Sequence, residues 1–561
     1  MSWRFQATFL FFIFLLLCVV GRLFYWQVVR ADELSAIGQS QYGQRIKLMP
    51  KRGEIRTSDG FPIATNTISY LAFANPKVVS QKEKTAILLA PFLETEVASI
   101  SSALSLNRFW IALGSKISAE KKESIEKFSL EGIGFEEQPS RFYPEASTAA
   151  KILGFVGKDE NGEDKGYFGL EGYYDRQLRG KSGLAVQVID AVGRPILARM
   201  DDNSAAINGR SLNLHIDRSI QFLVEHELKK GIEKYGAQGG MIGILNPKTG
   251  SVLAMAAFPS YDQKKYNDYS AEVFKNPFIT DSYEPGSTFK PLIMASALDS
   301  GVVKAYTKCS ICHGPILLGG YQIKTWNDQY HPNMTMTDVI RYSDNTGMVF
   351  VGQKLGLKRM LGYLNRFGIG EPTGIDLQGE ATPDIRPEES WYPIDVATAS
   401  FGQGVSVTAV ELLSAFSSIA NDGIRMEPHI VAAVVTPDGE KITIPAKEIN
   451  RPISAPTAKV MTEILVNAVD KGEAKWAKPK GYRIAGKTGT AQIPVEGHYD
   501  PSQTIASFMG FAPADDPKFV MLVVVDRPTS SIYGSETAAP LFFTIAKNLL
   551  TYYGIGPTEA E

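Results

Sequence analysis

Glu284-Pro-Gly-Ser-Thr-Phe-Lys290 is the most informative stretch of this 561-residue sequence. Its Pro-Gly pair favours a sharp turn into a helix that the pattern predicts over residues 287–298. Ser287 and Lys290 are three residues apart, so their side chains project from the same face of that helix. A desolvated lysine can stay neutral and take the proton of a serine hydroxyl, which makes the serine a nucleophile. Alone, this S-x-x-K pattern is more typical of an N-capping serine beside a solvated lysine.

A second motif, Tyr342-Ser343-Asp344-Asn345, follows in the same part of the chain. It places a hydroxyl and a carboxamide two residues apart, within reach of one cleft. Ser343 can relay a proton to a leaving group, and Asn345 can hold a substrate amide. The same residue types are common in turns and helix caps, so this motif is also weak alone.

A third motif is Ala485-Gly-Lys-Thr-Gly-Thr490, which follows a strand-like segment. A strand edge carrying Lys487 and Thr488 can bind a substrate carboxylate. Gly489 lets a substrate backbone come close, and backbone N–H groups near Thr490 can complete an oxyanion hole. The competing interpretation is a surface strand that ends in a glycine turn. S-x-x-K, S-x-N and K-T-G in this order are far more specific than any one of them.

Composition excludes several classes of protein. The formal net charge is -2, and no basic excess indicates a nucleic-acid partner. Three cysteines cannot staple a disulfide scaffold. Cys309-Ser-Ile-Cys312-His313 matches the C-x-x-C-H pattern of haem attachment, but a local disulfide or free thiols fit two cysteines better than haem or metal. We expect neither a cofactor nor a metal ion.

The N-terminus predicts a membrane anchor over residues 5–26, after a short cytoplasmic stretch at 1–4. Residues 9–20 are uninterrupted apolar sequence, and with their flanks they reach the roughly 20 residues that a spanning helix needs. A cleaved signal peptide would need small residues before the cut, and a lipoprotein would need one before Cys18, where Leu17 stands. The basic residues around the span indicate its orientation only weakly.

The rest of the chain divides into two predicted domains and a tail over 556–561. Over residues 27–225, short stretches of alternating apolar and polar residues are interrupted by Gly, Pro and Asn. This pattern is typical of an irregular, strand-containing region, here called the pedestal. Residues 235–555 open with a hairpin over 240–245 and 251–257, continue with helices that include 337–355, and close with strands and a helix over 537–553. This order predicts an α/β (α+β) sandwich with one sheet.

From the anchor to the last helix the chain resembles a class B penicillin-binding protein of the division-specific FtsI type. The three motifs carry this resemblance, together with segments along the rest of the chain, namely Arg52-Gly-Glu-Ile-Arg-Thr-Ser-Asp-Gly60, Arg141-Phe-Tyr-Pro144, Gly154-Phe-Val-Gly157, Gly169-Leu-Glu-Gly172, Gly402-Gln-Gly404 and Tyr533-Gly-Ser-Glu-Thr-Ala-Ala-Pro540. It implies a penicillin-binding-protein/β-lactamase-like transpeptidase domain, with a central antiparallel sheet flanked by helices, on an elongated irregular pedestal. The implied location is the cytoplasmic membrane, with one pass and the catalytic domain outside the cytoplasm.

The resemblance also implies roles for the motif residues. The penultimate D-Ala of a stem peptide acylates Ser287, the terminal D-Ala leaves, and an amine of a neighbouring stem takes the acyl group. Lys290 would be the base, and Ser343 and Asn345 would shuttle the proton and bind the donor. Lys487 and Thr488 would hold the carboxylate, beside Gly489, and the amides of Ser287 and Thr490 would form the oxyanion hole. β-Lactams would acylate Ser287 as substrate mimics.

The implied partners are stem peptides and lipid-linked nascent glycan, a membrane glycosyltransferase of the FtsW/RodA kind, and other division proteins. Four alternatives remain at this point: an elongation-type transpeptidase, a D,D-carboxypeptidase, a β-lactamase, and a non-catalytic scaffold or β-lactam sensor. The trio Ser343-Asp344-Asn345 is also the one that class A β-lactamases carry. However, no E-x-x-L-N segment for a deacylating glutamate lies between Asn345 and Lys487.

Overall fold

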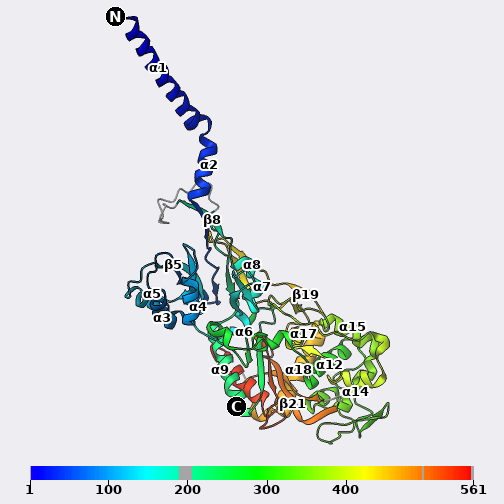
Figure 1. The fold of residues 1–561 in the computed structure, drawn as a ribbon. Helices are drawn as coiled ribbons and strands as arrows, with labels where there is room; N and C mark the ends of the chain where they lie inside the picture. The colour runs from blue at the N-terminus through cyan, green and yellow to red at the C-terminus, as the bar shows by residue number, and fades with distance from the viewer. Residues whose placement is uncertain (1, 189–204, 496–497, 558–561) are drawn as a thin grey trace. The chain divides into compact units, whose positions relative to one another are not determined.

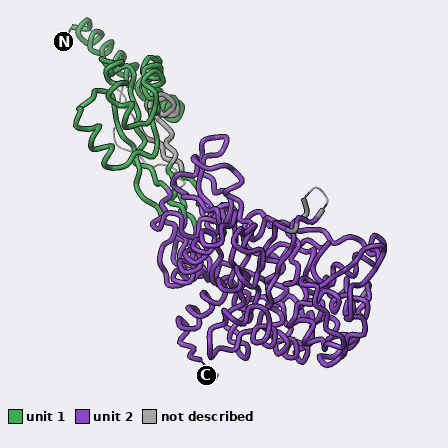
Figure 2. Tube along the Cα trace, turned by 90° about the horizontal axis from the view of Figure 1, so that it is seen from below, with its two compact units in different colours: residues 1–52, 66–140, 180–209 green, residues 53–65, 141–179, 210–561 purple. Residues whose placement is uncertain are grey.

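The structure is a computed structural model that describes residues 2–188, 205–495 and 498–557. Met1 and residues 558–561 of the predicted tail lie outside the described residues. Contacts between Cα atoms divide the chain into two compact units (Figure 2), and each draws on several separate segments. Unit 1 consists of Met1–Arg52, Asn66–Ser140 and Gly180–Gly209, and unit 2 of Gly53–Thr65, Arg141–Arg179 and Arg210–Glu561.

Unit 1 begins with helix α1 (Trp3–Phe24), which continues through a π-helical turn, η1 (Tyr25–Val29), into α2 (Ala31–Tyr42). In the described chain, Trp3–Val29 is the one helix long and apolar enough to cross a membrane, and none of its residues is buried. Strand β1 (Gly43–Leu48) pairs antiparallel with β8 (Gly183–Val188). A small core packs α3 (Lys82–Leu93), α4 (Val97–Leu104) and α5 (Ala119–Glu126) around residues such as Leu89 and Leu104.

Unit 2 is built on a five-stranded antiparallel sheet in the order β11-β10-β22-β21-β20. The predicted hairpin is confirmed as β10 (Gly239–Leu245) and β11 (Val252–Phe258). The strands β20 (Ala485–Val495), β21 (His498–Ala512) and β22 (Phe519–Asp526) complete the sheet. The central antiparallel sheet predicted from the sequence is therefore confirmed, and the third motif lies on β20, at its edge.

Helices cover both faces of this sheet, because its central strands are apolar on both sides. On β22, Val520, Leu522 and Val524 belong to one core cluster, and the residues between them belong to another. Figure 1 shows α9 (Arg218–Tyr235) and α19 (Ala538–Tyr552) on one side of the sheet. On the other side lie α12 (Lys290–Asp299), which begins with the lysine of the first motif, α17 (Ala409–Ala420) and α18 (Ala455–Lys471).

The helix predicted over residues 337–355 is interrupted, and this part of the prediction is wrong. The chain instead forms α13 (Met336–Arg341) and α14 (Asn345–Leu355), which are separated by three residues of the second motif. Ser343 has φ +56°, a left-handed conformation that ends α13. The side chain of Asp344 then accepts the backbone N–H of Gly347 at 2.8 Å and caps α14. The break turns Ser343 out of the helical pattern.

Segments that precede the sheet in sequence also pack in unit 2. Strand β2 (Ile55–Arg56) pairs parallel with β9 (Ser211–Leu214), which pairs antiparallel with β17 (Val431–Val435). Arg141 Nε donates to Glu171 Oε1 at 2.6 Å, and Arg141 Nη1 donates to the carbonyl of Gly53 at 2.7 Å. This ion pair is buried, so loss of either partner would leave an uncompensated charge in the core. Three of the segments that carry the resemblance thus meet at one point.

Candidate active site

Ser287 lies on a single 3-10 turn, η3 (Gly286–Thr288), which leads into α12. The sequence places Pro and Gly before it, and Gly286 adopts φ +54°, which favours glycine. The backbone N–H of Gly286 donates to the carbonyl of Gly402 at 3.0 Å. A Cβ on Gly402 would lie 2.1 Å from the carbonyl oxygen of Gly286, so this approach needs glycine there. The turn that presents Ser287 is therefore held by the Gly402-Gln-Gly404 loop.

Lys290 is fully buried beneath this turn. Its Nζ donates to the carbonyl of Ser343 at 2.6 Å, to Asn345 Oδ1 at 2.8 Å and to Ser343 Oγ at 3.3 Å. Burial lowers the pKa of Lys290 well below its usual range, and the nearby charge of Lys487 lowers it further. These three donated hydrogen bonds use all three N–H groups of the charged ammonium. The neutral amine keeps two N–H groups for the two carbonyl oxygens and has a lone pair that accepts from the Ser343 hydroxyl instead. The site thus favours Lys290 in the form that a base needs.

Ser343 connects the lysine to the serine. Its Oγ donates to Ser287 Oγ at 3.0 Å and accepts from Lys290 Nζ. In the part of the chain that the structure describes, no hydrogen bond joins Lys290 directly to Ser287, so the connection runs through the second motif. Asn345, the first residue of α14, accepts from Lys290 and donates its Nδ2–H to the carbonyl of Lys324 at 3.0 Å. The four predicted catalytic residues lie together.

Lys487 and Thr488 lie on the edge strand β20 and are both mostly buried. Lys487 Nζ donates to the carbonyl and to the Oγ1 of Thr488, each at 3.0 Å. Thr488 Oγ1 donates in turn to Glu473 Oε2 at 3.3 Å. Burial lowers the pKa of Lys487 to about 8, while the charge of Glu473 opposes this shift. Lys487 therefore titrates close to neutrality, which makes its charge sensitive to its neighbours.

Gly489 and Thr490 bring β20 against the turn that carries Ser287. A Cβ on Gly489 would lie 2.3 Å from Ser507 Oγ and 2.8 Å from Thr288 Cγ2, so any other residue would push the turn away from the strand. Thr490 Oγ1 accepts the backbone N–H of Gly534 at 3.0 Å, which ties the strand to the loop before α19. The predicted site residues thus lie on η3, on the loop between α13 and α14, on β20 and at the first residues of α12 and α14.

Two features of this site escaped the sequence analysis. Glu473 follows α18, outside the three motifs, and no spacing in the sequence connects it with them. Trp326 donates its Nε1–H to the carbonyl of Tyr342 at 3.3 Å, and its ring meets Tyr533 edge to face at 5.6 Å. This aromatic contact joins the loop of the second motif to the segment that holds Thr490. Only the tertiary fold brings these residues together.

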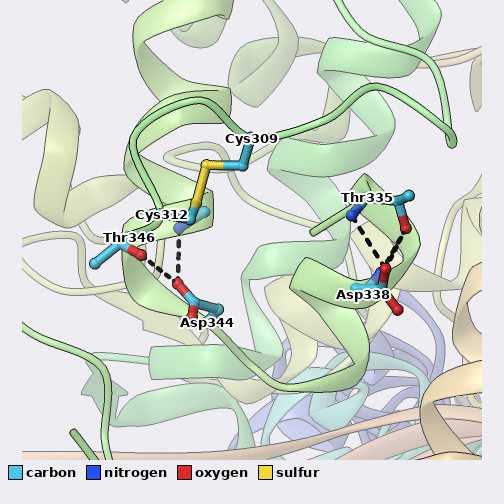
Figure 3. The surroundings of a disulfide bond; sticks show 7 residues. Cys309, Cys312, Thr335, Asp338, Asp344 and Thr346 are labelled. Carbon is cyan, nitrogen blue, oxygen red and sulfur yellow. Dashed lines mark hydrogen bonds between the residues drawn. A yellow bond between two sulfur atoms is a disulfide. The ribbon is translucent and has the colours of Figure 1, made fainter. Parts of the chain in front are cut away.

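The C-x-x-C pair supports the same loop. Cys309 and Cys312 form a disulfide and are both buried (Figure 3). The backbone N–H of Cys309 donates to the carbonyl of Met334 at 2.9 Å, just before the Thr335 cap of α13. Figure 3 shows this cap and Asp344 around the disulfide. Among the described residues, no cluster of three or more His, Cys, Asp or Glu side chains could hold a metal ion.

Comparisons with known proteins place this geometry in a family. Residues 240–550 match the family model of the penicillin-binding protein transpeptidase domain, which is more than half of the chain. The chain belongs to the class B penicillin-binding proteins. Residues 47–214 match the penicillin-binding protein dimerisation domain, so this penicillin-binding protein carries both parts.

Relatives and solved structures extend over nearly the whole penicillin-binding protein. It is 34% identical to stage V sporulation protein D of Bacillus subtilis, over 100% of this chain and 87% of that protein. It is 30% identical to the peptidoglycan D,D-transpeptidase FtsI of Escherichia coli K12, over 99% and 93%. A peptidoglycan synthetase from Bifidobacterium adolescentis superposes with a TM-score of 0.74 at 26% identity, over 92% of this chain and 98% of that one. Penicillin-binding protein 3 of Mycobacterium tuberculosis, complexed with aztreonam, gives 0.71 at 26% identity, over 92% and 100%.

Proposed function

We propose that this protein is a serine D,D-transpeptidase that cross-links peptidoglycan stem peptides through an acyl-enzyme on Ser287. The observation that carries the proposal is the hydrogen-bonded chain from Lys290 through Ser343 to Ser287, opposite Lys487 on β20. Acyl transfer to a serine requires a nucleophilic hydroxyl and a base that accepts its proton. The buried lysine would supply the base, and the second hydroxyl would relay the proton. The E. coli relative is the peptidoglycan D,D-transpeptidase FtsI, which has the activity proposed here.

In the acylation step, Ser287 Oγ attacks the carbonyl carbon of the penultimate D-Ala and its proton passes to Lys290. At rest the relay donates towards Ser287, and rotation of the two hydroxyl groups reverses it. The amides of Ser287 and Thr490 stabilise the oxyanion of the tetrahedral intermediate. Lys487 and Thr488 hold the terminal carboxylate, while Asn345 and Gly489 border the donor backbone.

When the intermediate collapses, the C–N bond breaks and the leaving D-Ala amine takes a proton from Lys290 through Ser343. The acyl group then forms an ester with Ser287. In the second step a stem-peptide amine attacks this ester and gives its proton to the relay, and Ser287 regains a proton as the C–O bond breaks. A β-lactam would acylate the same hydroxyl, but its amide bond lies in a ring, so the ring opens and no leaving group departs.

The test is to supply the full-length protein in detergent with a D-Ala-D-Ala stem pentapeptide and an acceptor amine. We expect a cross-linked product with release of one D-Ala per bond, and neither in Ser287→Ala. D-Ala release without product in the presence of the amine would favour a carboxypeptidase. Absence of both from folded protein would contradict the proposal and favour a scaffold or sensor.

The same proposal includes the setting of the reaction. Residues 5–26 would anchor the protein once in the cytoplasmic membrane, with the pedestal over 27–225 and the transpeptidase domain over 235–555 on the outer side. Similarity to FtsI favours septal synthesis, beside a membrane glycosyltransferase of the FtsW/RodA kind that supplies nascent glycan. Depletion in the source bacterium distinguishes the roles, because loss of septal synthesis gives filaments and loss of elongation gives rounded cells.

A further inference from the structure

The segment between α12 and α13 carries a short hairpin at the surface of unit 2. Strands β13 (Ile316–Leu318) and β14 (Tyr321–Ile323) pair antiparallel around Gly319 and Gly320, whose φ values are +58° and +85°. Two consecutive residues with positive φ form the tight turn that two-residue hairpins favour. The two glycines therefore fix the tip of the hairpin.

The hairpin is held against the domain along part of its surface. Ile316 and Leu318 are partly buried against the main core cluster, and Ile323 is buried within it. The tip reaches α16 (Pro393–Ala399), since a Cβ on Gly319 would lie 3.8 Å from the Cβ of Ile394. The hairpin cannot turn over to bury its exposed side chains without losing these contacts.

Large side chains that water surrounds gather on and beside this hairpin. Leu317 is 76% exposed and Tyr321 is 67% exposed. Tyr392 lies two residues before Ile394, which the tip approaches, and is 72% exposed. Trp326, three residues beyond β14, is 48% exposed. We call Leu317, Tyr321, Trp326 and Tyr392 the hairpin platform. Apolar and aromatic groups that stay exposed together indicate a binding surface.

The hairpin platform leads to the candidate active site. Trp326 Nε1 donates to the carbonyl of Tyr342 at 3.3 Å. The next residue is Ser343, whose Oγ donates to Ser287 Oγ at 3.0 Å. Five residues separate Tyr321 from Trp326, which limits the distance between their Cα atoms to about 17 Å. The platform therefore ends beside the second motif, whereas the donor carboxylate would be bound by β20.

The exposed side chains of the platform suit the rings of a carbohydrate. A sugar ring presents C–H groups on its faces, which pack on apolar and aromatic side chains, and polar groups at its edge. Tyrosine combines an apolar ring with a hydroxyl that stays in water. Charged residues nearby carry both signs and include two ion pairs, Lys324 with Asp328 at 3.9 Å and Arg386 with Asp395 at 3.2 Å. No single sign of charge would select the ligand.

We propose that the hairpin platform binds the glycan backbone of the acceptor strand, with Tyr321 and Tyr392 against its amino-sugar rings. This inference rests on the proposed transpeptidase function and adds a second site, for the polymer that carries the stem peptides. The donor stem would occupy β20, so the side of the second motif is left for the acceptor. An extended stem of five residues spans about 17 Å, so a strand held near Trp326 can bring its amine to the acyl group on Ser287.

The test compares two acceptors with the full-length protein in detergent. The donor is a stem pentapeptide whose own side-chain amine is acetylated. One acceptor is the free stem tetrapeptide of the source bacterium, and the other is the same tetrapeptide on an uncross-linked glycan fragment of several disaccharides. We expect kcat/KM for the cross-linked product to be about tenfold higher with the glycan-linked acceptor. Oligomers of N-acetylglucosamine should inhibit the reaction of this acceptor and not that of the free tetrapeptide.

Variants separate recognition of the glycan from support of the fold. Tyr321→Ala and Tyr392→Ala should each lower the preference for the glycan-linked acceptor to about threefold, and the double variant should lower it to about twofold or less. Phe222→Ala removes a ring that is 62% exposed on α9, which covers the other face of the sheet, and should keep the full preference. A double variant that keeps the tenfold preference would overturn the inference, as would an equal loss of kcat/KM for both acceptors.

The two proposals fail in different ways. Equal kcat/KM for the two acceptors in the unmodified protein would overturn the glycan site and leave the transpeptidase intact. A double variant that keeps the preference but cannot replace the depleted protein in the source bacterium would assign the platform to a protein partner and overturn the glycan site. Absence of cross-linked product and of D-Ala release with every acceptor would overturn both proposals.

Discussion

At the scale of single residues, the proposed mechanism requires opposite charge states of Lys290 and Lys487. In the proposed mechanism, Lys290 must be neutral to accept a proton, and Lys487 must be charged to bind a carboxylate. Burial lowers the pKa of both amines, to about 8 for Lys487 and well below the usual range for Lys290. Between the two pKa values the protein holds one neutral and one charged lysine.

This difference predicts a bell-shaped pH profile for kcat/KM with a D-Ala-D-Ala peptide. As pH falls, Lys290 gains a proton and the rate falls. As pH rises through about 8, Lys487 loses its charge and the rate falls again. A penicillin methyl ester, which has no carboxylate, should show only the acid limb when acylation is followed. An alkaline limb that is the same for both compounds would contradict the role of Lys487.

The charge of Glu473 is expected to influence both the acid and the alkaline limb of this pH profile. Its charge raises the pKa of Lys487 and of Lys290, so its loss should lower both. Glu473→Gln retains an oxygen for the Thr488 hydroxyl and removes only the charge. We predict that the whole pH profile moves to lower pH, with kcat/KM near pH 8 reduced several-fold. An unshifted profile would show that Glu473 supports the strand without affecting the lysines.

At the scale of elements, the motifs predicted which residues lie together in the candidate site better than the periodicity predicted the helices. Ser287, Lys290, Ser343 and Asn345 lie together, as their order in the chain suggested. The interruption of the helix over 337–355 was missed, because its flanks are both apolar and helical. The break depends on the φ of Ser343 and the cap from Asp344, and a Ser-Asp-Asn sequence fits a continuing helix poorly enough to have signalled it.

The disulfide between Cys309 and Cys312 is expected to stabilise the start of helix α13. Closure of the short loop between Cys309 and Cys312 contributes about 2 kcal/mol by the chain-entropy relation. We predict that Cys309→Ser/Cys312→Ser unfolds at a lower urea concentration and is acylated more slowly, since the adjacent backbone supports the Thr335 cap. Dithiothreitol should lower the urea midpoint of the unmodified protein and leave that of the variant unchanged. An equal midpoint for both proteins would contradict this stabilising role.

At the scale of the whole molecule, the order of the motifs and the apolar N-terminus predicted the class of protein. Sequence patterns did not predict which segments of the chain belong to each compact unit. Residues 53–65 and 141–179 belong to unit 2 although unit 1 segments lie between them in the chain. Their place depends on pairings such as β2 with β9 and on the Arg141–Glu171 ion pair, which join residues far apart in sequence. Glu473 and the hairpin platform escaped prediction for the same reason.

The central claim is that Ser287 forms an acyl-enzyme, and mass spectrometry of the intact protein tests it most directly. The full-length protein in detergent is incubated with benzylpenicillin and followed over hours, with Ser287→Ala alongside. We predict a lasting adduct of one penicillin that is absent from the alanine variant. An adduct that vanishes quickly while the drug is consumed would identify a β-lactamase. A folded protein that forms no adduct, or an equal adduct on Ser287→Ala, would contradict the account.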